Sequence, residues 1–422
     1  ESTASKILDL VENASARKSN SENFITKFSY YYTPLVVGLA VFLAIVPPLL
    51  TPERNFSRWI DIALTFLVVS CPCALVISVP LSFFAGIGAS SRLGILVKGS
   101  NYLEALAQTK KAVFDKTGTL TKGVFSVVEV ISEGMEEKEI LRLAMLAEQH
   151  SGHPIALSVK EAYKQRYDIY ADYDKHRIEN LKQIPGRGIS ISIDEREVLL
   201  GNVGLMEEFN IEYKSHAHEA TLLYMAVDLK YVACIVISDI IKDDAKQAIN
   251  ELKSMGISDI IMLTGDRKEV AEAVSGELGI SEVYSSLLPG DKLAKVEELL
   301  EKDNDPKHKL VFVGDGINDA PVLARADIGI AMGGLGSDAA IEAADVVIMN
   351  DEPSKIAGAI RLAKRTLGIA TQNIIFALLV KVVVLTFTAF GMVNMWAAVF
   401  ADVGVTLLAI ANAMRNLNIK KV

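Results

Sequence analysis

The chain has 422 residues, more than one ordinary domain holds, so at least two folded units fit within it. Its mean hydropathy of +0.30 together with 23% charged residues is typical of apolar membrane spans averaged with soluble domains. The net charge of -9, with no run of basic residues interleaved with aromatic ones, excludes a nucleic-acid partner.

The first part of the chain contains a solvated segment and two expected membrane spans. Residues 1–30 begin without the apolar stretch of a signal peptide and are interpreted as an amphipathic linker helix. Residues 31–50 carry no charge, which matches the ~20 residues needed to cross ~30 Å of hydrocarbon. Residues 60–88 hold one charge near their start and predict a second span. Residues 31–92 therefore form the first membrane segment, because uncharged stretches of this length rarely serve as core helices of soluble enzymes.

The middle of the chain has the pattern of an α/β protein. Short β-branched runs end in acidic or hydroxyl residues in KKAVFDKTGT, DIIMLTGD and HKLVFVGDG, with helical patterns between them. They predict a doubly wound parallel sheet built from residues 93–125 and 236–360, interrupted at 126–235 by an inserted α+β domain. Ligands of such sheets gather at the carboxyl ends of the strands, where Asp115, Thr264 and Asp315 lie.

The last part of the chain, residues 361–422, predicts two more spans. The apolar runs 373–390 and 395–411 are separated by the polar hinge from Gly391 to Asn394, which fits a helical hairpin. Basic residues cluster beside the spans at both chain ends and around the soluble middle, and predict that all three lie in the cytoplasm. The three cysteines, Cys71, Cys73 and Cys234, predict no disulfide framework and fit a reducing compartment.

Asp115, which opens DKTGTLT, is the candidate nucleophile, and Gly118 permits a tight turn after it. A carboxylate that accepts a phosphoryl group needs Mg²⁺ to neutralise the charge, and Asp315 offers a hard oxygen ligand. A hydrolytic phosphatase of this design needs an acid at the position of Thr117, so the aspartyl phosphate is expected to persist.

Further residues of the same motifs complete this candidate catalytic set. Thr264 can hydrogen-bond the phosphoryl oxygens and Lys292 can neutralise them. Taken singly, such tripeptides are more often surface turns; their order, each after a strand, favours catalysis. The remaining candidates are Lys116 beside the nucleophile, Asp266 of TGD, and Asn318 and Asp319 of GDGINDAP, which could orient the magnesium site.

Cys71 and Cys73 flank Pro72 in the middle of a span, where the proline removes a helical hydrogen bond and lets both thiols face one ion. Thiolates select Cu(I), Zn(II), Cd(II) or Pb(II). Lys381 and Asp402 each cost roughly 2.5–3.5 kcal/mol inside a span unless they are paired or functional. A carboxylate beside two thiolates suits a divalent ion better than Cu(I), and Lys381 can pair with Asp402 when the ion has left.

Several of these motifs carry a resemblance to a family. DKTGTLT, TGD and GDGINDAP resemble the signatures of P-type ATPases, and CPC with a lysine followed by DxG resembles their zinc, cadmium and lead group. The resemblance covers nearly the whole chain. It implies a haloacid-dehalogenase-like phosphorylation domain in which ATP phosphorylates Asp115, and Mg²⁺ is held by Asp115, the carbonyl of Thr117 and Asp315. EQHSGHPIA, GRGI and GN resemble the nucleotide domain of the heavy-metal branch, which implies nucleotide contacts at Glu148, His153, Pro154, Gly186, Gly188, Gly201 and Asn202.

The function that the resemblance implies is ATP-driven export of Zn²⁺ or Cd²⁺ through a bacterial plasma membrane, with membrane lipid and the transported ion as partners. Pb²⁺ stays open, and a Cu(I) exporter, a membrane-tethered phosphatase of the same superfamily and an idle regulatory subunit are the alternatives. The sequence contains no TGE loop of an actuator domain. The actuator domain and leading helices are therefore expected to be missing, so that this chain alone forms a phosphoenzyme but turns over poorly.

Overall fold

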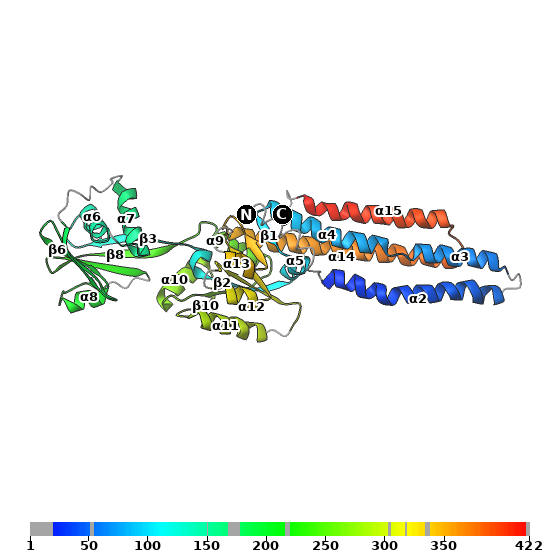
Figure 1. Ribbon diagram of the computed structural model, residues 1–422, viewed down its shortest axis with the longest axis horizontal. Coiled ribbons are helices and arrows are strands. Elements are labelled where there is room, and N and C mark those ends of the chain that lie inside the picture. Colours follow the sequence, from blue (N-terminus) through cyan, green and yellow to red (C-terminus); the bar gives the residue numbers. More distant parts are fainter. Residues whose placement is uncertain are drawn as a thin grey trace. The chain divides into compact units, whose positions relative to one another are not determined.

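The computed structural model describes residues 20–50, 55–149, 151–167, 178–215, 220–302, 305–316, 319–333 and 338–418 (Figure 1). The chain divides into two compact units. The first contains residues 1–114, 247–261 and 289–422, and the second contains residues 115–246 and 262–288. The first unit holds the apolar helices, and the second holds an antiparallel sheet with its own helices.

Among the described residues, four helical stretches are long and apolar enough to cross a membrane, in agreement with the four predicted spans. In Figure 1 these helices lie side by side, with α4 packed against α14 and α15, and α2 against α3. The first expected helix, at residues 1–30, falls partly outside the described residues, and α2 begins at Asn20. The bounds are α2 Asn20–Leu50, α3 Phe56–Val69, α4 Cys73–Arg92, α14 Ser354–Ala389, α15 Met395–Ala413 and the short η3 Met414–Leu417.

The N-terminal ends of α2 and α5 (Ser100–Ala107) are joined by reciprocal hydrogen bonds. The backbone N–H and the hydroxyl of Ser21 donate to the two carboxylate oxygens of buried Glu104, over 3.2 and 3.0 Å. In return, the hydroxyl of Ser100 donates to Glu22 over 2.5 Å. Each carboxylate thus lies at a helix N-terminus, where unpaired N–H groups and the helix dipole favour negative charge.

The larger sheet has seven strands in the order β1-β13-β12-β11-β2-β9-β10. β11 pairs in parallel with both β2 and β12, and β12 pairs in parallel with β13. This confirms the predicted doubly wound fold, whereas the short antiparallel edge strand β1 was not predicted. The strands are β1 Ile95–Val97, β2 Thr109–Asp115, β9 Asp259–Leu263, β10 Glu282–Tyr284, β11 Lys309–Gly314, β12 Ile328–Met332 and β13 Val346–Ile348; the helices between them are α9 Ala245–Ser254, α10 Lys268–Leu278, α11 Pro289–Glu301, α12 Ala320–Arg325 and α13 Asp338–Ala343.

The inserted region forms a six-stranded antiparallel sheet in the order β3-β8-β7-β6-β5-β4. Its tight hairpins turn at Asp194–Glu195 and Asp228–Leu229, which all have positive φ, as two-residue turns between twisted strands require. β3 and β8 extend beyond residues 126–235, because they pair from Thr121 opposite Ile241 onward. The elements are β3 Thr121–Ser132, β4 Ile178–Ile184, β5 Gly188–Ile193, β6 Arg196–Gly201, β7 Thr221–Val227, β8 Lys230–Ile241, α6 Glu137–Ala147, α7 Pro154–Tyr167 and α8 Val203–Glu208.

Cys234 on β8 is fully buried, as its apolar surroundings predict, and burial raises the pKa of its thiol from 9.0 to about 12. Because the folded state favours the neutral thiol, its contribution to stability is complete below pH 9.0 and is lost as the pH rises toward about 12. We expect an alkylating reagent to leave Cys234 unmodified in the native protein and to modify it quickly in denaturant, as measured by peptide mass spectrometry. Rapid native modification would contradict this burial.

Candidate phosphoryl-transfer and ion sites

Asp115 is the last residue of β2 and is buried, with 5% of its surface exposed. The chain turns sharply after it, since Gly118 has a φ of 72°, which confirms the predicted turn. The turn is held by Lys242, a buried residue that the sequence analysis missed. The Lys242 ammonium donates to the Gly118 carbonyl over 3.0 Å, and its backbone N–H donates to Leu120 over 2.9 Å. The position of Asp115 therefore depends on the end of β8.

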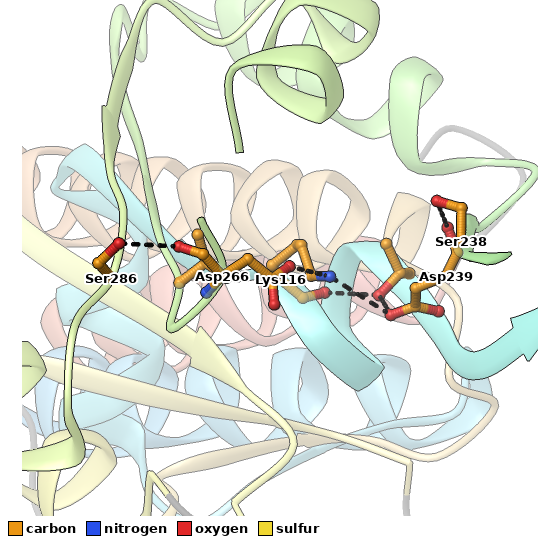
Figure 2. Close-up of polar contacts among 7 residues, drawn as sticks. Lys116, Ser238, Asp239, Asp266 and Ser286 are labelled. Atoms are coloured by element: carbon orange, nitrogen blue, oxygen red, sulfur yellow. Dashed lines mark hydrogen bonds and ion pairs between the residues drawn. The ribbon is translucent and has the colours of Figure 1, made fainter. Parts of the chain in front are cut away.

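Figure 2 shows Lys116 between two carboxylates, Asp239 and Asp266. Lys116 forms an ion pair with Asp266, and its Nζ lies 3.8 Å from Asp239. The hydroxyl of Thr121 lies 2.5 Å from the Asp239 carboxylate and 3.0 Å from the carbonyl oxygen of Lys116. Such partners offset the cost of placing an ammonium away from water. Asp239 was also missed, although an acidic residue at the end of the β-branched run IVIS is an available signal.

Thr264 directly follows β9 and is 2% exposed. Its hydroxyl oxygen accepts a hydrogen bond from the N–H of Asp266 over 3.1 Å. The carbonyl of Asp266 accepts in turn from the N–H of Ser286 over 2.7 Å and from the Ser286 hydroxyl over 3.4 Å, the second of which Figure 2 draws. The TGD turn is thus fixed on both sides. The bond to Asp266 uses a lone pair of Thr264, which keeps the hydroxyl proton available for an acceptor such as a phosphoryl oxygen.

The first unit carries the other predicted catalytic residues. Lys292 on α11 donates to both oxygens of Asp319, over 3.1 and 3.3 Å, and Asp319 is 1% exposed just before α12. Asp315 follows β11, the strand that runs parallel to β2 with Val313 opposite Phe114. Asn318 lies outside the described residues. The convergence of Asp115 and Asp315 on one Mg²⁺ ion stays a prediction.

In the inserted domain, the structure brings together four of the residues assigned to nucleotide binding. Gly188 on β5 pairs with Gly201 on β6. The side-chain amide of Asn202 donates to the Gly186 carbonyl over 2.9 Å. Gly186 and Gly188 have φ values of 73° and 151°, which side chains rarely adopt. These four residues therefore lie together at one end of the β5–β6 pair, and the approach of their backbone to a nucleotide stays a prediction.

The other assigned nucleotide residues lie in the connection from α6 to α7. His153 is exposed and caps α7, because its Nδ1 accepts from the N–H of Ile155 over 3.3 Å and Pro154 begins the helix. Glu148 is half-buried at the end of α6. Lys160 holds the connection by donating to the carbonyls of Gln149 and Ser151, over 3.0 and 2.9 Å. Contact of Glu148 and His153 with a nucleotide stays a prediction.

Replacing Gly188 by alanine is expected to destabilise the inserted domain. The added Cβ would meet the Leu200 carbonyl and lie 2.6 Å from the Gly201 Cα, on a backbone with positive φ. Thermal unfolding and binding of a fluorescent ATP analogue should both weaken, by roughly 1–3 kcal/mol. Gly276→Ala is the control, since its Cβ on α10 meets nothing within 4 Å. If Gly188→Ala matched Gly276→Ala in unfolding temperature and in binding of the analogue, the close packing of Gly188 against Leu200 and Gly201 would be contradicted.

In the membrane, the helix is interrupted where Pro72 was expected to loosen it. α3 ends at Val69 and α4 begins at Cys73. Lys381 on α14 donates to the Val69 carbonyl, which the interruption leaves without a helical partner, and to the Asp402 carboxylate over 2.6 Å. The predicted pairing of Lys381 with Asp402 is confirmed. The pair offsets the cost of placing each charge in a span.

The cysteine pair differs from the prediction. Cys71 and Cys73 are joined by a disulfide, so the expectation that the cysteines stay as thiols is wrong for this pair. The two-residue spacing across the unwound turn places their Cα atoms 5.4 Å apart, a separation that a disulfide spans. Among the described residues, no three His, Cys, Asp or Glu side chains gather as a metal site. The structure instead contains two separate pairs, Cys71 with Cys73 and Lys381 with Asp402.

A cavity of about 210 Å³ lies beside the ion pair. Lys381 and Asp402 contribute its charged wall, and the remaining wall is mostly apolar, including Tyr32, Val69, Pro72 and Ala377. This volume is many times that needed for one water molecule, so it can accommodate a partly hydrated ion. The cavity therefore connects the interrupted helix with the half-buried Asp402 carboxylate.

An aspartate that closes a strand of a doubly wound sheet, followed by an inserted antiparallel domain, defines the haloacid dehalogenase-like class. A family model described as haloacid dehalogenase-like hydrolase matches residues 109–327. The chain is 58% identical over 421 residues to the cadmium, zinc and cobalt-transporting ATPase of Bacillus subtilis, and 50% identical over 418 residues to the zinc-transporting ATPase of Synechocystis sp.. These alignments cover 100% and 98% of this chain but 59% and 57% of the relatives, so the chain spans less than two thirds of their length.

A solved structure extends this similarity to three dimensions. The crystal structure of a zinc-transporting PIB-type ATPase in the E2.Pi state matches with a TM-score of 0.83 at 36% identity. The match covers 98% of this chain and 67% of that one. The chain therefore belongs to the PIB-type ATPases, the heavy-metal branch of the P-type family.

Proposed function

We propose that this chain supplies the phosphorylation, nucleotide and ion sites of a pump that uses ATP to export Zn²⁺ or Cd²⁺ through an aspartyl-phosphate intermediate. The observation that carries the proposal is the Lys381–Asp402 pair at the Pro72 interruption, in a chain whose strand β2 ends at the aspartate of DKTGTLT. The relatives support it, since those of Bacillus subtilis and Helicobacter pylori are both named cadmium, zinc and cobalt-transporting ATPases.

In the proposed reaction, a carboxylate oxygen of Asp115 attacks the γ-phosphorus of ATP, and the bond from that phosphorus to the β-phosphate oxygen breaks to release ADP. Thr264 donates its hydroxyl proton to a phosphoryl oxygen, and Lys292, oriented by Asp319, balances negative charge. Asp115, the Thr117 carbonyl and Asp315 form an all-oxygen donor set that fits Mg²⁺, which when bound neutralises charge on the phosphoryl group. The backbone at Gly186, Gly188 and Gly201, with Asn202, Glu148 and His153, holds the nucleotide.

At the ion site, the Cys71–Cys73 disulfide is first opened by exchange with a dithiol of the reducing cytoplasm, which is itself oxidised to a disulfide. The two thiolates then bind the transported ion together with Asp402. When the ion leaves, Lys381 again forms its ion pair with the Asp402 carboxylate, so that no unpaired charge remains in the span. Two thiolates and a carboxylate suit a soft divalent ion. This donor set makes Cu(I) the less suitable cargo.

The location and partners belong to the same proposal. The spans lie among the lipids of a bacterial plasma membrane, with the catalytic units in the cytoplasm, as the basic residues beside the spans indicate. An actuator domain and leading helices complete the pump in this proposal. The relatives have enough additional residues to contain them.

The proposal is tested by labelling the purified protein with ATP that carries a radioactive γ-phosphate, in the presence of Zn²⁺, Cd²⁺, Pb²⁺ or Cu(I). We expect Zn²⁺ or Cd²⁺ to stimulate labelling, and Asp402→Ala to weaken that stimulation. Labelling favoured by Cu(I) and indifferent to Asp402 would support the copper alternative. Metal-independent hydrolysis of small phosphoesters would instead support a phosphatase.

A further inference from the structure

A cluster of amide and hydroxyl side chains lies inside the helix bundle, away from the ion pair. We call it the amide cluster, and its members come from α4, α14, the end of α15 and η3: Ser78, Ser82, Asn373, Asn412 and Asn416. Asn412 donates to the Asn373 side-chain carbonyl over 2.9 Å, and Asn373 donates to the Ala409 backbone carbonyl over 3.0 Å. Asn416 donates to the Ser82 backbone carbonyl over 3.0 Å. These bonds connect the elements around one polar centre.

The cluster is buried but not satisfied. Ser78, Ser82 and Asn416 have no exposed surface and Asn373 has 1%. Within the part of the chain that the structure describes, the Ser78 hydroxyl and the Asn416 side-chain carbonyl have no hydrogen-bond partner. Orphan polar atoms are costly inside a protein and more so at membrane depth, where lipid offers no substitute. The two atoms are therefore free to hydrogen-bond a ligand such as water or a hydrated cation.

The amide cluster and the ion-pair cavity lie at two different levels along the same helices. Going back along α14 from Lys381, Ala377 comes after four residues and Asn373 after eight, which is about 6 and 12 Å along the helix. On α4, Ala74 is likewise four residues before Ser78. Between the two polar levels, Ala74, Leu75 and Ala377 form an apolar layer with Val405 packed against it. Ala74, Ala377 and Val405 also line the cavity. A layer of apolar side chains, two of them alanines, thus separates the cavity from the amide cluster.

We infer that the amide cluster is an access site that holds the transported divalent cation, still carrying its water ligands, before it reaches Cys71, Cys73 and Asp402. The inference rests on the proposed function. Amide and hydroxyl oxygens accept hydrogen bonds from the water ligands of an aqua ion, so they can hold it without stripping its shell. Neutral ligands bind weakly enough to release it, as an intermediate site on a conduction path requires. On α14, which follows β13 in the chain, Asn373 lies nearer to the first residue, Ser354, than Lys381 does.

Ser78→Ala tests the inference in the protein at its natural length, reconstituted in lipid nanodiscs. The change removes a hydroxyl without a described partner, so a purely structural cluster predicts unchanged or higher thermal stability and an unchanged Zn²⁺ requirement. An access site predicts that the Zn²⁺ concentration for half-maximal labelling by ATP rises about tenfold, or ~1.4 kcal/mol. Maximal labelling at saturating Zn²⁺ should stay the same.

Thr366→Val is the matched control. Thr366 is also buried on α14, and its hydroxyl has no hydrogen-bond partner among the residues that the structure describes. It packs next to Gly86 of α4 and Leu103 of α5, and it forms none of the hydrogen bonds given above for the amide cluster. Its variant should leave the Zn²⁺ requirement unchanged. A second variant, Asn416→Asp, adds a negative charge of the same shape and should lower the half-maximal Zn²⁺ concentration.

The outcomes separate the two claims. If the wild-type protein shows no metal-stimulated labelling, the proposed function fails. If the wild type is stimulated but Ser78→Ala leaves the Zn²⁺ requirement unchanged, only the access site is refuted. An equal shift in Thr366→Val, or a shift accompanied by lower thermal stability, would also overturn it.

Discussion

Replacing Asp115 by asparagine is expected to reduce phosphoenzyme formation from ATP at least ~10³-fold, as loss of a nucleophile does. The amide has nearly the same shape and fits the same buried position at the end of β2, so folding should be preserved. Its nitrogen carries no charge to attack phosphorus, and its oxygen is a weaker Mg²⁺ ligand. Acid-stable labelling with ATP at saturating Zn²⁺ measures the loss, and thermal unfolding checks the fold.

Asp243→Asn is the matched control for this variant. Asp243 lies in the same unit, its side chain is 91% exposed, and it pairs only loosely with Lys122 at 3.3 Å. An exposed pair of this kind contributes little to stability. The control should keep wild-type labelling, and substantial labelling of Asp115→Asn would remove this residue from the role of nucleophile.

Removing Lys381 is expected to destabilise the bundle more than removing the whole ion pair. Lys381→Met leaves the Asp402 carboxylate beside a mostly apolar cavity and the Val69 carbonyl without its donor. Breaking a buried pair in this way costs about 3–5 kcal/mol, whereas replacing both partners with apolar residues is often neutral. Lys381→Met together with Asp402→Leu should therefore recover the thermal stability of the wild type.

The same double variant separates stability from ion binding. It should fold but show no Zn²⁺-stimulated labelling, because the carboxylate ligand is gone. Unfolding midpoints and labelling of the single and double variants form a double-mutant cycle. A double variant that is less stable than Lys381→Met, or that is still stimulated by Zn²⁺, would contradict the assigned role of the pair.

Local chemistry predicted much of the fold and part of the site. Features that depend only on neighbouring residues can be read directly from the sequence. They include the charge-free spans, the turn at Gly118 and the interruption at Pro72. The Lys381–Asp402 pair was predictable because each charge is costly in a span and needs the other.

The features that were missed depend on residues far apart in the chain. Lys242 and Asp239 reach the DKTG turn only because β3 and β8 pair at their ends. The strand β1 has only three residues. It pairs with β13, which is the last strand in chain order, so its neighbouring residues do not reveal its partner. The disulfide of Cys71 with Cys73 depends on how far the turn unwinds, which the spacing alone leaves open.

The reciprocal bonds between Ser21 and Glu104 and between Glu22 and Ser100 have a mechanical consequence. α5 ends at Ala107 and β2 begins at Thr109, so little slack separates the tether from the strand that ends in Asp115. The four side chains thus connect the start of the first apolar helix to the strand that positions Asp115, without an intervening loop.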